Sequence, residues 1–448
     1  MPYNYVPFAT AKSQLALRLY DSTFWSDTER GVYIQQALRT FNSYANFWRS
    51  EFVLDSVINT HWYDISDITV APNTLRRFTV TDVDIYKLIQ YHFLEPATGA
   101  AWSGSSQFSA ADLLQAVQRR RDELLSGSGC TVYKANVPAV PGRTFLPDKT
   151  IDIRRVAWIP VAGFGYSNSP LWKDDNFALE SYENSYTIEA PGTPETYQQS
   201  SQPPLSFDVN IPPAVPGEYE VITVDAGSAL DVSASTVMNL PDDFTWVLVF
   251  GAMADLMNRD SNAKDSLRAR YCNLRYAQGL ALLANAPAVM SCRINNLPTP
   301  IDSAQNMDNF RSGWQAESAG TPNVIITAGL NLIGLAPKPD AGPYGITLSV
   351  VQNAPIPVND VDLIQVGKDE YDAVLDYAVH LASFKMGGTE FLSTIPLFER
   401  FVKQASIYNS KLSEMGEYTD IMKGISQLQA ETNPVMSTAD AVAPQNGV

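Results

Sequence analysis

Gly192-Thr193-Pro194 and Gly320-Thr321-Pro322 open two copies of one stretch of this chain, which has 448 residues. The first copy leads to a helical segment that begins near Phe244, and the second leads to one that begins near Tyr371. The offset between the copies is 128 positions at the glycines and 127 at these aromatic residues. An offset that stays constant over this length predicts an internal duplication, in which one structural unit is used twice.

Each copy ends in two segments that are predicted to form an αα-hairpin. Phe244 and Tyr271 lie 27 positions apart in the first copy, and Tyr371 and Phe398 have the same separation in the second. Apolar residues recur at helical spacing around all four, so these aromatic side chains are predicted to pack the two helices of each hairpin together. Gly387-Gly388 is predicted to break the second hairpin.

The Gly-Thr-Pro motif is predicted to form a rigid turn between strands. Glycine frees the backbone, whereas proline fixes φ and removes a hydrogen-bond donor. The residues assigned to this structural role, in preference to ligand binding, are Gly192, Pro194, Tyr197, Gly320 and Pro322.

Short strands rich in β-branched residues separate the turns and the hairpins. The clearest of them are 205–211 and 218–224 in the first copy, and 330–335 and 346–351 in the second. The predicted fold class is therefore α+β: a helical bundle of αα-hairpins with small antiparallel β modules, internally duplicated.

Two helices precede the duplicated stretch, at about 28–48 and at 110–125, and Ser109 is predicted to cap the second. Strand signals follow both helices, including the run 151–159, so these leading segments form a second, fainter repeat. The predicted division is an N-terminal helix and strand module, a second helix and strand, two copies of a β module plus αα-hairpin, and a flexible C-terminal tail, over residues 1–105, 106–160, 161–285, 286–415 and 416–448.

The composition of the chain argues against some classes of protein. The net charge of −17 argues against a protein whose whole surface grips phosphate backbones, and it suits a surface that DNA passes without adsorbing. The same charge also fits plain solubility. Three cysteines without metal or disulfide spacing indicate a reducing cytoplasm, and neither a signal peptide nor a bilayer-spanning apolar run is expected.

No catalytic motif is recognisable. His61, His92 and His380 are the only histidines, and none lies in a metal-binding or general-base motif. The acidic pairs Asp242-Asp243 and Asp369-Glu370 fall at helix starts, where carboxylates cap free amides. The prediction is a protein that is not an enzyme and binds no cofactor or metal.

Three features together resemble the head-to-tail connector (adaptor, head completion or neck) proteins of tailed bacteriophages. They are the Gly-x-Pro-x-x-Tyr turn at Gly192, the Gly-x-Tyr strand at Gly217, and the Leu-Pro-Asp-Asp-Phe sequence that opens a hairpin at Leu240. The resemblance is clearest over 185–285 and recurs over 314–412. The second copy departs from it, with Val324-Ile325 where the tyrosine would stand, and many adaptors are shorter.

The resemblance implies a structural virion protein, made in the host bacterial cytoplasm and located in the neck at the head–tail interface. It implies a homo-oligomeric ring, with about twelve copies, that joins the portal protein to tail or neck proteins and lines the DNA channel. Genomic DNA would pass through without specific binding, and no membrane is involved. A C-terminal segment would dock on the portal, with the candidate residues Phe401, Tyr408, Leu412 and Pro434.

Two other readings stay open. The nearer one is another virion structural protein, such as a collar, tail terminator or baseplate component. The more distant one is a carbohydrate-binding or hydrolytic β module, for which the sequence offers no pair of catalytic carboxylates.

Overall fold

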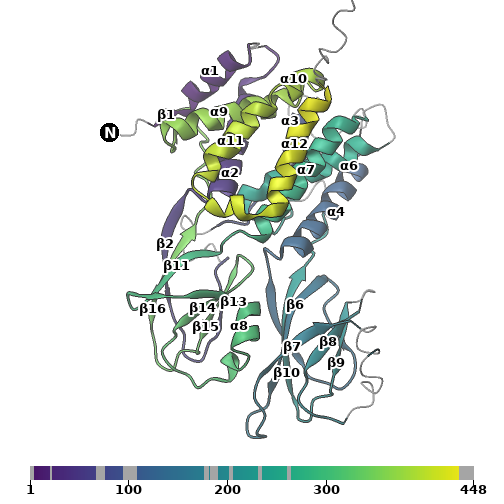
Figure 1. Ribbon diagram of the computed structural model, residues 1–448, viewed down its shortest axis with the longest axis vertical. Coiled ribbons are helices and arrows are strands. Elements are labelled where there is room, and N and C mark those ends of the chain that lie inside the picture. Colours follow the sequence, from purple (N-terminus) through teal and green to yellow (C-terminus); the bar gives the residue numbers. More distant parts are fainter. Residues whose placement is uncertain are drawn as a thin grey trace, which may run out of the picture.

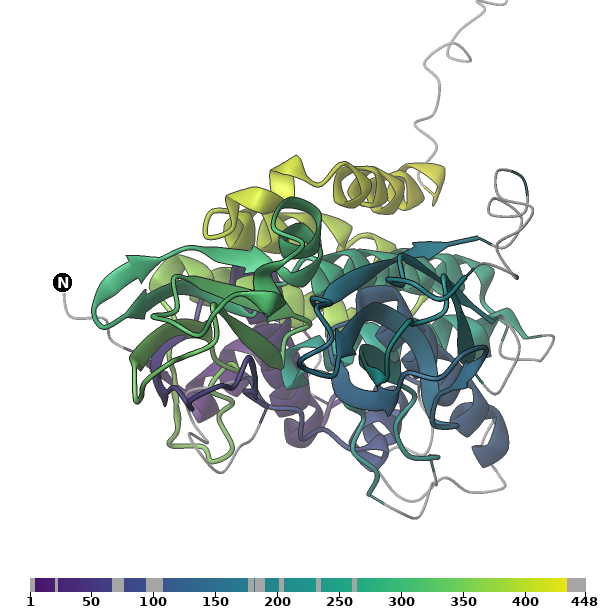
Figure 2. The ribbon, with the colours of Figure 1, turned by 90° about the horizontal axis from the view of Figure 1, so that it is seen from below.

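The computed structural model describes residues 5–20, 23–66, 76–93, 108–175, 181, 190–200, 205–230, 235–259 and 264–432. Helices gather at one end of the molecule and strands at the other (Figure 1). Seen from below, the strands form two β regions that lie side by side under the helices (Figure 2).

The helical end is built around α2 (Asp27–Ala45), which packs against the later helices of the chain. Its start is fixed by a capping box between Ser26 and Glu29, and the same device starts α3 and α4. The other helices of this end are α1 (Phe8–Arg18), α3 (Asp82–His92), α4 (Ala110–Ser128), α6 (Thr245–Asn258), α7 (Ser266–Ala284), α9 (Lys368–Ser383), α10 (Gly388–Leu392), α11 (Ile395–Ser406) and α12 (Gly416–Thr432).

One β region is a single sheet of seven strands. Its strands, in spatial order, are β4 (Tyr133–Pro138), β10 (Gly217–Asp225), β6 (Thr150–Pro160), β7 (Ser169–Asp174), β8 (Thr196–Gln199), β9 (Ser206–Asn210) and β5 (Thr144–Phe145). All neighbours are antiparallel except β7 and β8.

The other β region holds two sheets of four strands each. The first contains, in order, β12 (Leu297–Thr299), β11 (Val289–Ile294), β16 (Gly345–Val351) and β2 (Arg49–Asp55). The second contains β13 (Ile301–Ser303), β14 (Val324–Ala328), β15 (Leu332–Ala336) and β3 (Trp62–Asp64). The short helix α8 (Ala304–Phe310) follows β13, and a two-stranded pairing of β1 (Val6–Pro7) with β17 (Leu363–Ile364) lies apart from these sheets.

The two β regions share one strand order. The order β4-β10-β6-β7 corresponds to β2-β16-β11-β12, and β7-β8-β9-β5 corresponds to β13-β14-β15-β3. The single parallel pair recurs at the equivalent place, as β7 with β8 and as β13 with β14. The helices show the same correspondence, because α4 packs on α6 and α7 in the way that α2 packs on α9 and α11.

One of these units lies inside the other along the chain. We call residues 108–284 the continuous unit, since they supply α4, the seven-stranded sheet, α6 and α7. We call residues 26–66 and 286–412 together the split unit, because α2, β2 and β3 come from the first segment and the other elements come from the second.

The prediction of a helical bundle with small antiparallel β modules is wrong. The chain is α+β, but its sheets are large and are not confined to local modules. The physical reason is long-range pairing: β2 at residues 49–55 pairs with β16 at 345–351, and β3 pairs with β15. Local periodicity shows that a segment is a strand but not which distant strand completes its sheet.

One further segment differs from expectation. Residues 416–432, expected to be flexible, form α12, which packs on α7. Among the described residues, no helix combines the length and the apolarity that crossing a bilayer requires.

Candidate assembly interface

The Gly-Thr-Pro segments occupy equivalent places in the two units. Gly192 forms an isolated parallel bridge with Pro213, and Gly320 forms one with Pro339. The amide of Gly192 donates to the carbonyl of Pro212 at 2.8 Å, and that of Gly320 donates to the carbonyl of Lys338 at 2.9 Å. Pro194, Tyr197 and Pro322 are buried. Pro194, Tyr197 and Pro322 therefore shape the β regions from within, whereas Gly192 and Gly320 are half-buried.

The aromatic residues assigned to the hairpins lie in or beside the helical core, and two of them meet at His380 of α9. The hydroxyl of Tyr271 lies 2.6 Å from Nε2 of His380, and the ring of Phe398 stacks on the imidazole with centroids 5.6 Å apart. Phe244 is buried at the start of α6, and Tyr371 hydrogen-bonds Gln14 of α1. Tyr271 thus links the first hairpin to the second through His380, whereas Phe398 packs on His380 within the second hairpin.

The candidate portal-docking residues do not form one surface. Phe401 is fully buried, with its ring stacked on Tyr377 at 4.4 Å, and Leu412 is also buried. Tyr408 is 40% exposed and its neighbour Ile407 is 69% exposed, so the end of α11 is where this segment reaches solvent. Pro434 lies outside the described residues. The apolar spacing in the sequence here marks the core, because an amphipathic helix buries its periodic face whether or not a partner exists.

Several titratable side chains of the helical end are buried among packed residues. Burial, aided by the positive charge of Arg275, lowers the pKa of His380 to about 3. Burial raises the pKa of Asp243 to about 6, although Asn42 and the amide of Ala354 donate hydrogen bonds to its carboxylate. Asp242 accepts hydrogen bonds from the amides of Thr79 and Val80. These aspartates bind segments remote in sequence, which differs from the predicted capping of their own helix.

The part of the chain that the structure describes contains no group of three or more His, Cys, Asp or Glu side chains placed to hold a metal ion. The cysteines Cys130, Cys272 and Cys292 are buried and unpaired with one another.

A buried polar cluster joins the two units. Arg155 of β6 contacts both carboxylate oxygens of Asp308 in α8, with Nε at 2.6 Å and Nη2 at 3.0 Å. Its Nη1 donates to Glu220 of β10 at 2.9 Å, and Nη2 also donates to Gln315 at 2.9 Å. The guanidinium carbon lies 5.5 Å from the ring centroid of Trp314. The buried guanidinium of Arg155 therefore binds carboxylates from both units. Its contact with Asp308 is bidentate, and it stacks on the ring of Trp314.

Glu220 receives further donors from the split unit. The indole nitrogen of Trp62 donates to its Oε1 at 3.1 Å, and the amide nitrogen of Gln315 donates to the same oxygen at 2.7 Å. Trp314 donates to Asp308 at 2.9 Å. Because every charge in this buried cluster has several partners, its desolvation is compensated, and the two units are held in one relative position.

This contact uses different surfaces of the two units. The continuous unit contributes the outer face of its sheet, through Arg155 and Glu220. The split unit contributes Trp62, α8 and the turn Trp314–Ala316. The sheet position of the split unit that corresponds to Glu220 is Thr347, which takes no part in this cluster and is half-buried. Two related units that touch through unlike surfaces are related head to tail, which is a heterologous contact.

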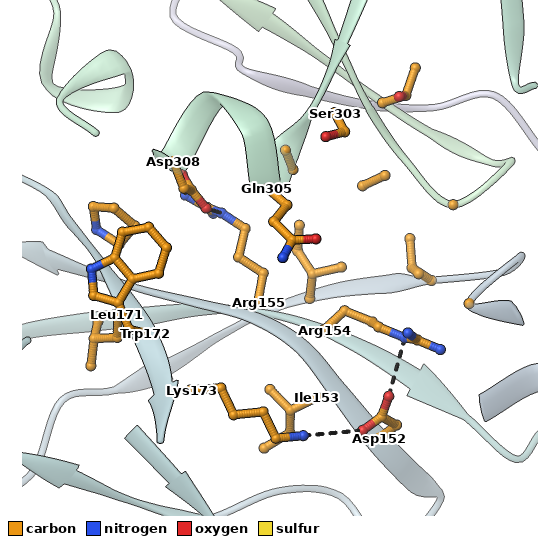
Figure 3. Close-up of a pocket in the computed structure, with 18 of the residues that line it drawn as sticks. Asp152, Ile153, Arg154, Arg155, Leu171, Trp172, Lys173, Ser303, Gln305 and Asp308 are labelled. Atoms are coloured by element: carbon orange, nitrogen blue, oxygen red, sulfur yellow. Dashed lines mark hydrogen bonds and ion pairs between the residues drawn. The ribbon is translucent and has the colours of Figure 1, made fainter. Parts of the chain in front are cut away.

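A cavity of about 470 Å³ lies beside this cluster, between β6 and β7 on one side and α8 on the other (Figure 3). In it Arg154 and Lys173 both point toward Asp152, at 3.1 and 3.9 Å. Arg155 and Asp308 in the same wall bind each other. Both carboxylates are bound by cations, which does not favour the free general acid and base of a hydrolase, and the lining keeps one positive charge in excess.

This interface was not predicted from the sequence. The run 151–159 was recognised as a strand, and Arg155 within it was the available signal, since a charged residue inside an apolar strand requires a buried partner. Asp308, Trp314 and Gln315 lie about 150 residues later, and nothing local connects them to the strand.

No protein-family model matches this chain, and no curated protein matches its sequence.

Proposed function

We propose that this protein is a structural component of a tailed-phage virion, an adaptor ring in the neck that joins the portal to the tail and lines the DNA exit channel. The observation that carries the proposal is the head-to-tail contact between the two units. A heterologous contact that repeats with closure generates a ring, whereas a twofold contact ends in a dimer. The chain thus already contains one instance of the contact that a ring requires.

The charge of the chain supports a role around DNA without specific binding. A net charge of −17 disfavours adsorption of a polyanion to the protein, because like charges repel across a channel. Genomic DNA would then pass through the ring without sequence readout, and the working contacts are with portal, tail or neck proteins and with other copies of this chain.

The proposed portal contact lies at the exposed end of α11. Ile407 and Tyr408 are exposed there, whereas Phe401 and Leu412 are buried and stabilise the helix from within. The ring of Tyr408 packs edge-on against Phe47 at 5.0 Å, and its hydroxyl hydrogen-bonds the carboxylate of Glu370. An exposed aliphatic side chain beside an anchored aromatic one is a suitable centre for a protein interface.

Deletion of the gene from the phage, followed by electron microscopy of the lysate, tests the proposal. The expected result is tailless heads that are empty or leaking DNA, beside separate intact tails, and complementation with the wild-type gene should restore joined particles. Joined heads and tails that lack a distal structure would place the protein in the baseplate instead. Unchanged infectious particles would refute any structural role in the virion.

A further inference from the structure

The outer faces of the two equivalent sheets differ in what covers them. In the continuous unit, Glu220 of β10 lies between Ala157 and Asn136 on the neighbouring strands. In the split unit, Thr347 of β16 lies between Arg293 and Val53 in the same arrangement. The adjacent row is Arg155, Ile222 and Lys134 in one unit and Ser291, Ser349 and Glu51 in the other.

Among the residues that the structure describes, the other unit covers the first of these faces, whereas side chains on the second are exposed. Arg155, Ala157, Glu220 and Ile222 are all buried, and the split unit supplies Trp62, Asp308, Trp314 and Gln315 over Arg155 and Glu220. On the other face Glu51, Ser291 and Arg293 are exposed, and Val53 is 63% exposed. We call Glu51, Val53, Ser291, Arg293, Thr347 and Ser349 the open sheet face.

We infer that the open sheet face binds a second copy of this chain, through the region around β5 of that copy's continuous unit. The contact repeats between chains the one seen within the chain, where a unit covers the sheet of its neighbour. The inference rests on the proposed assembly into a ring, and it does not depend on which virion proteins that ring joins.

The strand equivalence identifies the residues that would meet. Trp62, which donates to Glu220 within the chain, lies at the start of β3. The pairing of Tyr63 with Ile333 corresponds to that of Thr144 with Phe207, so Arg143 of the continuous unit takes the place of Trp62. Since Thr347 takes the place of Glu220, the contact predicted between copies is Arg143 with Thr347.

Each of the two surfaces that would meet carries an exposed apolar side chain and a charged one. Phe145, two residues beyond Arg143, is 61% exposed, and Val53 beside Thr347 is 63% exposed, so docking would bury two apolar side chains. Arg143 is half-exposed beside Asp208, and Glu51 on the open sheet face offers an additional carboxylate.

Thiol-specific cross-linking of the full chain with a short bismaleimide tests the contact, since the equivalent contact within the chain joins the ends of two long side chains and a direct disulfide could not span it. A variant carrying Arg143→Cys and Thr347→Cys should give a ladder of multimers on a denaturing gel, and the native cysteines are buried and should not interfere. Each single variant should stay monomeric on that gel, whereas a mixture of the two single variants should give a dimer and nothing larger. No ladder from the double variant, or a single dimeric species from it, would overturn the inference.

A second measurement covers the case in which the cysteines perturb packing. Val53→Arg should reduce the assembled fraction at least tenfold by mass photometry, while its circular dichroism stays that of the wild type. The control is Val361→Arg, which changes an 80% exposed valine outside the open sheet face and should assemble normally. Assembly of Val53→Arg at the wild-type level, or a wild-type chain that is monomeric at every concentration, would also overturn the inference. A cross-linked ladder combined with normal virions after gene deletion would instead refute the neck function and leave this contact standing.

Discussion

Nε and Nη2 of Arg155 lie 2.6 and 3.0 Å from the two carboxylate oxygens of Asp308, and this buried pair joins a strand of the continuous unit to a helix of the split unit. The partners are 153 positions apart in the sequence. Within the described residues they hold the relative position of the two β regions more directly than any other ion pair, because Glu220 and Gln315 complete the same network.

We predict that Arg155→Met lowers the free energy of unfolding by about 3–5 kcal/mol, because it leaves Asp308 and Glu220 buried without their cation. Urea denaturation followed by tryptophan fluorescence measures this, since Trp62 and Trp314 lie in the cluster. Lys423→Met is the control, because it removes a lysine from an exposed pair with Asp420 and should cost less than about 1 kcal/mol. Equal losses in the two variants would show that the Arg155 cluster does not hold the units together.

The sequence predicted elements well and their partners poorly. Ser109 was predicted to cap the helix at 110–125, and α4 is found at 110–128 with Ser109 as its cap, which confirms the capping prediction. Strand β6 was likewise predicted to within a residue at each end. Such features depend on local propensity and capping, which neighbouring residues determine.

Contacts between residues far apart in the sequence could not be predicted from local patterns. Nothing in the residues around Val53 specifies that Thr347 lies opposite it, because strand alternation is the same for any partner. For the same reason the apolar spacing around Phe401 fitted both a core helix and a docking helix, and the structure places Phe401 in the core. The candidate interface depends on contacts of this kind, so it emerged only from the three-dimensional arrangement.

Arg275 of α7 supports a second stability prediction. It is fully buried, and its Nη1 and Nη2 donate to the hydroxyls of Tyr44 and Tyr377 at 2.6 and 2.7 Å. Its guanidinium carbon lies 4.2 Å from the ring centroid of Phe398. No ion pair with a carboxylate is found for it in the described part of the chain, so tyrosine hydroxyls, the side-chain oxygen of Gln278 at 2.6 Å and aromatic faces stabilise this charge.

Arg275→Met should therefore cost about 2–4 kcal/mol, because it leaves two buried hydroxyls without a donor and removes the cation–π contacts. Arg275→Lys should also be destabilising, since one ammonium cannot reproduce the planar fork that reaches both tyrosines. Thermal unfolding by calorimetry measures both, with Lys403→Met on the exposed side of α11 as the control. Wild-type stability of the lysine variant would contradict the assigned role of the guanidinium geometry.

Acid should destabilise the fold through its buried histidines. Burial lowers the pKa of both His92 and His380 to about 3, against 6.5 for an exposed imidazole. Below pH 6.5 the unfolded chain binds protons that the folded chain excludes, so stability is full above this pH and falls as the pH falls. Each histidine contributes up to about 1.4 kcal/mol per pH unit. Asp243 acts in the opposite direction, because its folded pKa of about 6 exceeds its usual 3.8 and its protonation favours the folded state between these values.

Urea denaturation at a series of pH values from 4.5 to 7.5, about the span over which these groups act, tests the signs. The wild type should lose stability as the pH falls, Asp243→Asn should lose it more steeply, and His92→Gln should lose it less steeply. The same pH dependence in the wild type and in His92→Gln would mean that exclusion of a proton by the buried His92 does not contribute to it.

The portal contact is testable at one exposed residue. Ile407 is 69% exposed at the end of α11, and replacing it with aspartate would place a charge in the proposed apolar interface without disturbing the core. We expect Ile407→Asp to weaken binding to the purified portal protein at least tenfold in biolayer interferometry, while its unfolding midpoint stays that of the wild type. Val361→Asp introduces the same charge at an 80% exposed aliphatic site away from α11, so it controls for the change in net charge and should bind normally. Equal affinities for the two variants would exclude the end of α11 as the docking site, and no binding by the wild type would argue for a collar, tail terminator or baseplate role, because an adaptor requires the portal contact.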